Sequence, residues 1–352
     1  MLKLRPMAHT VYHELAIHLD QLPGGFPSTA DGVELRILRR LFTEAEARLA
    51  CRLTLIPETS RVVAYRCGMD HEVAADILAA MWQKGLILKD DTRGKPPRYM
   101  ASQFVVGIWE FQVNRLDPLL VADMAAYIPV LLDADVWRRA PQMRTIPVKR
   151  SIDPELTVLP HEAAATLIRS KDHFVVSPCI CRQEQHMAGN GCDRPLDACI
   201  SFGDAGSYFV RAGIGRTVDR RTVLDILETA DRSGLVLQPS NSRDPAWICC
   251  CCGCCCGVLR TLKTYPRPAD LMAAPFTARL DDKSCNGCGV CVHRCQMDAL
   301  TLTHTTAQLD RHRCIGCGLC VSTCPTGALG LMRKSKGKQP RVPANMATAL
   351  LK

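Results

Sequence analysis

A duplicated set of cysteines near the C-terminal end constrains the fold of this chain more than any other feature. The spacing C-x2-C-x2-C-x3-C occurs once from Cys285 and again from Cys314. The flanking residues repeat too, because Ala-Leu-Thr-Leu after the first set corresponds to Ala-Leu-Gly-Leu after the second. The eight cysteines are Cys285, Cys288, Cys291, Cys295, Cys314, Cys317, Cys320 and Cys324. The repeat predicts two equivalent halves, each arranged around its thiols.

The spacing is the one that binds a [4Fe–4S] cubane cluster. Three cysteines on a tight loop can reach three corners of one cube, whereas the fourth lies too far along the chain and ligates the other cluster. Paired structural zinc sites are the alternative, but zinc ribbons pair two C-x2-C knuckles across a longer gap. The rule therefore predicts two [4Fe–4S] clusters, one held by Cys285, Cys288, Cys291 and Cys324, the other by Cys314, Cys317, Cys320 and Cys295.

Over residues 277–332 the chain resembles the bacterial 2[4Fe–4S] ferredoxin, on the strength of the two quartets. The resemblance implies a βαβ-βαβ domain with two clusters. The proline that follows the fourth cysteine of each quartet is present as Pro325, but its counterpart is Gln296. Since hydrogen bonds near the sulfurs tune cluster potentials, we expect Gln296 to give its cluster a polar neighbour and a shifted potential.

The chain has 352 residues and 21 cysteines, and its length is typical of two or three domains. Its first twenty residues hold no sustained apolar segment like that of a signal peptide, and no stretch approaches a membrane-spanning length. Disulfides are therefore not expected to explain the cysteines. We expect the protein to lie in a reducing cytoplasm, in an anaerobic cell that tolerates oxygen-sensitive clusters.

The formal net charge is +9, and the end of the chain is basic. We expect residues 333–352 to form a disordered, solvated tail. The alternative is that the tail steers the protein toward an acidic partner or nucleic acid. Its basic residues are Arg333, Lys334, Lys336, Lys338, Arg341 and Lys352, and it contains no acidic residue.

The N-terminal part predicts a short helix with a linker over residues 1–27 and a small domain over residues 28–111. Leucines at helical spacing predict one helix over Glu34–Leu55, followed by a second helix ending at Gly68. A third helix, with Asp70 as its N-cap, is expected to bury Val73. Strands over 86–88 and 99–101 flank a Gly-Lys-Pro-Pro turn. By this pattern the domain resembles a winged-helix domain.

The third predicted helix argues against DNA binding, because its exposed residues are net acidic and phosphates would repel them. These residues are Asp70, His71, Glu72, Asp76, Gln83 and Lys84. We therefore expect this domain to dock a protein partner. Cys51 and Cys67 are expected to be buried small hydrophobic residues. A helical connector is expected over residues 112–147.

Residues 148–270 predict a mixed α/β, cysteine-rich domain. The set C-x-C-x10-C-x6-C is expected to bind a third [4Fe–4S] cluster, with zinc or free thiols as the alternatives. Arg182 would supply positive charge beside the reduced cluster. The four cysteines are Cys179, Cys181, Cys192 and Cys199.

The same region contains seven cysteines among the eight residues from Cys249 to Cys256. Neither a helix nor a strand would favour cysteine at every position, so the run predicts metal or sulfur ligands. Its two Cys-Cys-Gly sequences resemble the motif of heterodisulfide reductase subunits, which implies a further or non-cubane iron–sulfur cluster. The candidate ligands are Cys249, Cys251, Cys252, Cys255 and Cys256, and which of them bind stays open.

Together these patterns predict an α+β multidomain protein that passes single electrons between [4Fe–4S] clusters and a partner oxidoreductase. One alternative is a catalytic oxidoreductase subunit with a substrate-reducing cluster at Cys249–Cys256. Another is a redox-sensing transcription regulator with a winged helix. The sequence holds no phosphate-binding loop, dinucleotide fingerprint or hydrolytic triad to which a catalytic residue could be assigned. An electron carrier or oxidoreductase subunit is therefore favoured over a stand-alone enzyme.

Overall fold

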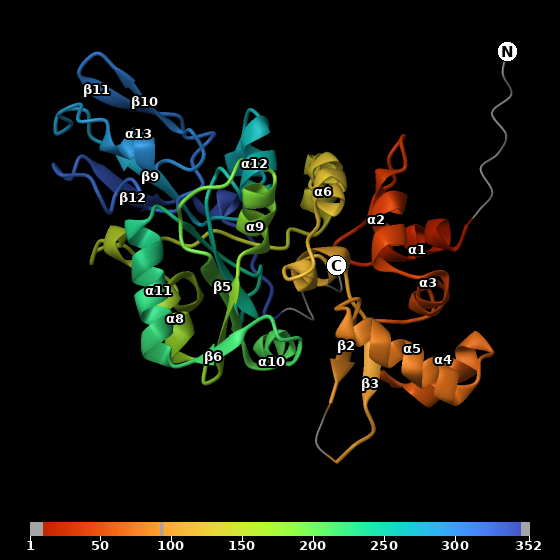
Figure 1. Ribbon diagram of the computed structural model, residues 1–352. Helices are drawn as coiled ribbons and strands as arrows, with labels where there is room; N and C mark the ends of the chain where they lie inside the picture. The colour runs from red at the N-terminus through yellow and green to blue at the C-terminus, as the bar shows by residue number, and fades with distance from the viewer. Residues whose placement is uncertain (1–9, 92–93, 346–352) are drawn as a thin grey trace, which may run out of the picture. The chain divides into compact units, whose positions relative to one another are not determined.

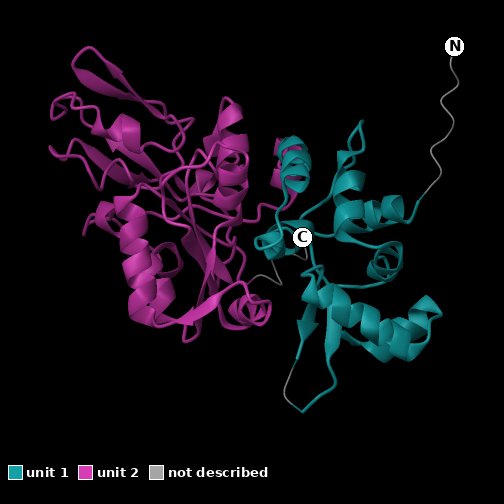
Figure 2. Ribbon diagram, viewed as in Figure 1, with its two compact units in different colours: residues 1–131 teal, residues 132–352 magenta. Residues whose placement is uncertain are grey.

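The structure is a computed structural model that describes residues 10–91 and 94–345 of the chain. The chain forms two compact units, residues 1–131 and 132–352 (Figure 2). Helices occur with several small sheets, as expected for an α+β protein. Within the described ranges, none of the helices combines the length and the apolar character needed to cross a bilayer.

The first unit contains six α-helices in its described part. They are α1 Val11–Asp20, α2 Val33–Leu41, α3 Glu44–Ala50, α4 Ser60–Cys67, α5 His71–Gln83 and α6 Pro118–Leu131, with short turns η1 Phe104–Ile108 and η2 Glu110–Gln112. The prediction of one helix over Glu34–Leu55 is wrong, because α2 ends at Leu41 and a separate helix, α3, begins at Glu44. The Thr43 hydroxyl accepts a hydrogen bond from the Glu46 N–H, and the Glu46 carboxylate accepts one from the Thr43 N–H. This capping box marks the start of α3.

The same unit contains a three-stranded antiparallel sheet in the order β1-β3-β2. Its strands are β1 Glu58–Thr59, β2 Ile87–Asp90 and β3 Arg98–Ala101. Asp70 caps α5 as predicted, since its carboxylate accepts the Glu72 and Val73 N–H groups. The expected burial of Val73 is wrong: the residue is 50% exposed, because α5 packs through the face that carries Leu78 and Met81.

The second unit is built on a five-stranded antiparallel sheet in the order β6-β4-β5-β8-β7. Its strands are β4 Phe174–Pro178, β5 Asp197–Phe202, β6 Arg216–Val218, β7 Val236–Pro239 and β8 Trp247–Cys251. Its helices are α7 Ala134–Arg139, α8 Ala164–Arg169, α9 Ile180–Met187, α10 Gly203–Arg211, α11 Arg220–Arg232 and α12 Gly257–Thr264. Helices α8 and α11 pack side by side, and α11 contacts β4, β5 and β7 (Figure 1).

The cysteine run is divided between a strand and the turn that follows it. Cys249, Cys250 and Cys251 lie in β8, where Cys249 pairs with Cys199 of β5. Only these three of the seven cysteines lie in the strand, which has a partner on each side and includes the fully buried Ile248. The chain then turns, and α12 begins at Gly257.

The C-terminal part of this unit adds two small antiparallel pairs, β9 with β12 and β10 with β11. Its elements are β9 Phe276–Leu280, α13 Val290–Arg294, β10 Leu300–Thr303, β11 Thr306–Leu309 and β12 Leu329–Arg333. The helix expected in the second half is replaced by turns. There the Ser322 and Thr323 hydroxyls donate to the Leu319 carbonyl at 3.2 and 3.1 Å, which competes with helical backbone bonds.

The basic segment after β12 differs from the disordered tail expected over 333–352. Arg333 forms an ion pair with the buried carboxylate of Glu162, and the Lys334 N–H donates to the Pro275 carbonyl at 2.9 Å. Farther on, the Arg243 N–H donates to the Pro343 carbonyl at 2.8 Å. The prediction of disorder is therefore wrong up to residue 345; residues 346–352, with Lys352, lie outside the described residues.

Four short turns complete the second unit: η3 Lys149–Ser151, η4 Pro160–Glu162, η5 Pro268–Asp270 and η6 Lys336–Lys338.

Candidate metal centres

Two cavities lie in the C-terminal part of the second unit, and each has four cysteines in its lining. The first cavity is lined by three cysteines of the first quartet and the last of the second: Cys285, Cys288, Cys291 and Cys324. The other cavity is lined by the reciprocal set: Cys295, Cys314, Cys317 and Cys320. Each cavity thus takes its fourth cysteine from the other quartet. The pairing of β9 with β12, which lie at opposite ends of the module, brings the two halves together.

Backbone N–H groups point at several of these sulfurs. The Ala299 N–H lies 3.2 Å from the Cys295 Sγ, and the Ala278 N–H lies 3.3 Å from the Cys314 Sγ. Similar amide donors stabilise thiolate charge when a cysteine binds iron. Four soft sulfur donors around each cavity, with amide hydrogen bonds behind them, fit a [4Fe–4S] cluster in each cavity.

Glycine allows the loops of both quartets to lie close to neighbouring backbone. Gly287 has a φ of +69°, and a Cβ there would lie 2.3 Å from the Thr305 carbonyl oxygen. Gly316 has a φ of +67°, and a Cβ there would lie 2.2 Å from the Phe276 carbonyl oxygen. Side chains at these two positions would push the cysteine loops away from the β10–β11 turn and from β9.

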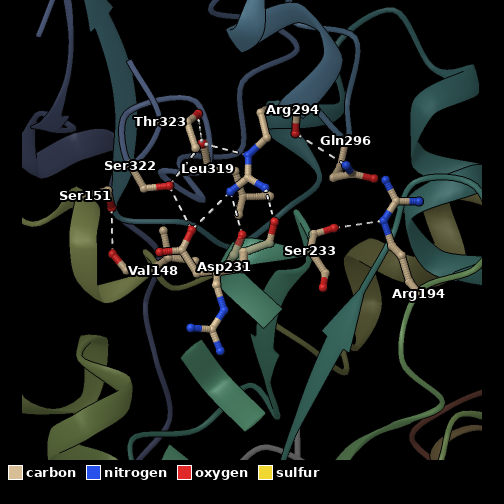
Figure 3. Close-up of polar contacts among 11 residues, drawn as sticks. Val148, Ser151, Arg194, Asp231, Ser233, Arg294, Gln296, Leu319, Ser322 and Thr323 are labelled. Atoms are coloured by element: carbon tan, nitrogen blue, oxygen red, sulfur yellow. Dashed lines mark hydrogen bonds and ion pairs between the residues drawn. The ribbon is translucent and has the colours of Figure 1, made fainter. Parts of the chain in front are cut away.

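A buried ion pair joins this module to α11 (Figure 3). The Arg294 guanidinium lies 3.1 Å from the Asp231 carboxylate and donates to the Arg232 carbonyl at 2.8 Å. The Ser322 hydroxyl donates to the same Asp231 carboxylate at 2.8 Å. The side chain of Arg294 is 14% exposed and that of Asp231 is 5% exposed, so the ion pair lies inside the unit.

Gln296 joins the same module to the cysteine run. The Gly253 N–H donates to the Gln296 side-chain oxygen at 2.7 Å, and a Cβ on Gly253 would lie 2.2 Å from the Gln296 carbonyl oxygen. Gly253 stands between Cys252 and Cys254, whereas Gln296 follows Cys295. The residue that replaces the usual proline thus connects a quartet cysteine to the central thiols.

Six thiols of the central region form a closed ring of neighbouring side chains. Each of these thiols has two others as its nearest thiol neighbours, although the cysteines come from three separate segments of the chain. Antiparallel pairing of β5 with β8 supplies the link between Cys199 and Cys249. The ring passes through Cys179, Cys181, Cys256, Cys251, Cys249 and Cys199, and returns to Cys179.

Four further thiols form a second group, whose sulfur atoms all lie within 4.8 Å of one another. The members are Cys192, Cys252, Cys254 and Cys255. Arg194 donates to the Cys254 Sγ at 3.3 Å. Burial alone would raise the pKa of the Cys192 thiol, but hydrogen bonds from the Arg194 backbone and side chain help to lower this pKa to about 6.

The structure therefore divides the cysteines that the sequence grouped together. Cys179, Cys181 and Cys199 belong to the ring, whereas Cys192 belongs to the group of four. The run is divided too: Cys249, Cys251 and Cys256 lie in the ring, and Cys252 and Cys255 in the group of four. Sequence reasoning missed Cys254, because spacing alone does not distinguish it from Cys250, the other cysteine of the run that was left out.

Arg182 and Glu184 are buried charged residues of α9 near the ring. Burial alone would lower the pKa of Arg182, but Cys179 and Cys252 raise it above its usual range. Arg182 donates to the Cys250 carbonyl at 2.7 Å, so its charge lies beside the cysteine run. Burial also raises the pKa of Glu184 to about 7, although Arg260 opposes the shift.

The two cysteines of the first unit differ slightly from expectation. Cys51 and Cys67 are half-buried instead of fully buried. Burial raises the pKa of the Cys51 thiol to about 11 and also raises the pKa of Cys67, so both favour the neutral thiol. All 21 cysteines, which lie within the described ranges, are free thiols.

Comparison with known proteins gives one result for the C-terminal module. No curated protein and no solved structure matches the chain. Residues 278–331 match the family model of the 4Fe-4S dicluster domain, which confirms the resemblance that the two cysteine quartets carry. The match and the group of four thiols together indicate an iron–sulfur protein with a redox role.

Proposed function

We propose that this protein transfers single electrons between [4Fe–4S] clusters and a partner oxidoreductase. Cubane clusters, when bound, supply one-electron oxidation and reduction. The eight quartet cysteines would hold two of them, in the partition that lines the two cavities. The dicluster match supports the cofactor, and the cavities support the assignment of its ligands.

The ring of six thiols is the proposed third iron–sulfur centre. It replaces the set of four cysteines expected from sequence spacing, because Cys179 neighbours both Cys181 and Cys199 whereas Cys192 lies with other thiols. Buried Arg182 supplies the positive charge beside it. Such charge favours a site that gains negative charge on reduction.

One observation supports the proposed order of the centres along the transfer path: the hydrogen bond of 2.7 Å that the Gly253 N–H donates to Gln296. It connects the residue after Cys295 to the loop between Cys252 and Cys254. The cavity that contains Cys295 is therefore the one joined to the central thiols, and the cavity that contains Cys285 would face the external donor or acceptor.

An anaerobic iron and sulfide count with EPR tests this proposal. We expect at least eight irons per chain and reducible cubane signals. In matched variants, Cys288→Ser should stop exchange with an external donor, whereas Cys317→Ser should stop reduction of the central centre and leave the external exchange intact. Fewer than eight irons with no reducible cubane signal would contradict the proposal.

The first unit would dock the partner oxidoreductase in a reducing cytoplasm. Its winged-helix-like order of elements carries large apolar side chains on the surface, with Tyr65 at 91%, Ile56 at 70% and Val73 at 50% exposure. Exposed apolar groups favour protein contacts, and the acidic positions of α5 disfavour DNA. A gel-shift assay at low salt in both redox states should therefore show no retarded DNA; a retarded band would favour the transcription regulator.

A catalytic oxidoreductase subunit is the second candidate, and the number of thiols in the ring favours it. Six neighbouring thiols exceed the four that a cubane uses, as expected for a larger or non-cubane cluster like that implied by the Cys-Cys-Gly resemblance. If the centre reduces a thiol or disulfide substrate, such compounds should change its EPR signal. A cubane-only spectrum that does not respond to them would leave electron transfer as the function.

A further inference from the structure

The group of four thiols outside the ring has the geometry of a site for one ion. We propose that Cys192, Cys252, Cys254 and Cys255 hold a single divalent zinc or iron ion as a tetrahedral tetrathiolate centre. This centre is separate from the [4Fe–4S] clusters of the proposed function. Within the described part of the chain, these residues are the one group of three or more potential ligands whose donor atoms all lie within 4.8 Å of one another.

The distances between sulfur atoms carry the inference. A metal–sulfur bond of about 2.3 Å places the corners of a tetrahedron about 3.8 Å apart. Three sulfur pairs measure 3.9 Å for Cys192 and Cys252, 3.6 Å for Cys192 and Cys255, and 3.8 Å for Cys254 and Cys255. In a cubane, each thiolate binds a different iron at its own corner, so the sulfur atoms lie farther apart.

The local chain supports such a site from two directions. Three ligands come from one tight turn between β8 and α12, and Cys192 comes from the loop between α9 and β5. The contact between the loop and the turn joins two segments that are 60 positions apart in the sequence, as Cys192 and Cys252 show. A bound ion would thus act as a cross-link between them.

Arg194 provides the second layer of the site. It donates to the Cys254 Sγ at 3.3 Å, and its Nε donates to the Ser233 carbonyl at 3.0 Å (Figure 3). Four thiolates around a divalent ion leave a net charge of −2, which the guanidinium partly balances. Residues that hold and orient a ligand in this way are the usual second layer of metal sites.

The site also explains why a glycine, Gly253, lies between the ligands Cys252 and Cys254 in the turn. Its N–H donates to Gln296, and its missing side chain lets the turn approach the Gln296 backbone. The turn that presents three ligands is therefore fixed to the dicluster module. Loss of the ion would loosen this contact without removing any cluster ligand.

The test begins with the full-length protein purified anaerobically. Zinc, iron and sulfide are counted per chain, and zinc-edge X-ray absorption and Mössbauer spectra are recorded. The zinc arm predicts one zinc per chain with four sulfurs at about 2.3 Å. The iron arm predicts one iron in excess of the clusters, with the Mössbauer signature of a high-spin tetrathiolate. Absence of both signatures in the wild-type protein overturns the inference.

Variants then assign the ion to these residues. The double variant C192S/C254S should lose that one ion and keep the dicluster EPR signals. Cys250→Ser, in the same run, is the matched control and should keep the ion. Cys288→Ser should lose cluster iron and sulfide but retain the ion, which separates this inference from the proposed function. An unchanged metal content in C192S/C254S, or loss of several irons with sulfide, overturns the inference; if this variant does not fold, the wild-type spectra decide.

Discussion

Gln296 shows how one residue can change the connections of a cysteine quartet. A proline at this position would have no side-chain oxygen for the Gly253 N–H, which Gln296 accepts at 2.7 Å. The sequence predicted a polar neighbour for the cluster at this position. It gave no sign that the amide would reach the cysteine run, because Gly253 and Gln296 are 43 positions apart.

Replacing this amide should weaken the unit without removing a ligand. In Gln296→Leu the Gly253 N–H stays buried without its acceptor, which should cost about 1–3 kcal/mol of folding free energy. Chemical denaturation measures the loss, and iron analysis should show an unchanged iron content. Gln308→Leu, at an exposed position of β11, is the matched control and should be nearly neutral. Equal stabilities of the two variants would contradict the role of Gln296.

Glu184 predicts a dependence on pH. Its side chain is 1% exposed, and burial is the main cause that raises its pKa to about 7. Below pH 7 the folded protein therefore holds a proton that the unfolded chain releases above about pH 4.5. Stability should fall as pH rises between these values, because the unfolded state then binds fewer protons.

The variant Glu184→Gln should remove this dependence. Above pH 7 it should be more stable than the wild type, by up to about 3 kcal/mol, and the difference should vanish near pH 4. Denaturation at several pH values measures the difference. Infrared spectroscopy should show a protonated carboxyl band that disappears with a midpoint near pH 7 in the wild type and is missing in the variant. A midpoint near pH 4.5 would contradict the prediction.

At the scale of elements, local signals predicted more than pairing did. Asp70 marks the start of α5 because a cap acts on the next few residues. The thiol groups depend instead on strand register: Cys199 lies opposite Cys249 because β5 pairs with β8. Sequence spacing grouped Cys192 with Cys199, but spacing carries no information about which distant strand will pair.

The register of β8 gives a prediction about neighbouring cysteines. Side chains alternate between the two faces of a strand, so Cys249 and Cys251 share a face and Cys250 points to the other. Cys251→Ala should therefore lose the iron of the third centre, whereas Cys250→Ala should keep it. Iron and sulfide counts distinguish the variants, with the dicluster EPR signals as the internal control. Equal iron loss in both variants would contradict the ring.

At the scale of the second unit, α11 is the element that links the sheet to the dicluster module. It contacts β4, β5 and β7, and Asp231 near its C-terminal end binds Arg294 and Ser322. Electron transfer within the unit requires a fixed separation between its centres. The buried pair of Asp231 and Arg294 is therefore expected to maintain both stability and transfer.

Asp231→Ala tests this role, because it leaves the Arg294 guanidinium buried without its carboxylate. Removing one partner of a buried ion pair costs about 3–5 kcal/mol. Glu228→Ala, three residues earlier on α11, is the matched control: its pair with Arg232 is about 60% exposed and should contribute less than about 1 kcal/mol. Denaturation measures stability, and flash reduction of the dicluster module measures transfer to the central centre. The Asp231 variant should keep its iron but lose stability and transfer more slowly, whereas the Glu228 variant should match the wild type. Unchanged transfer in a destabilised Asp231 variant would show that the ion pair holds the fold together without setting the distance between the centres.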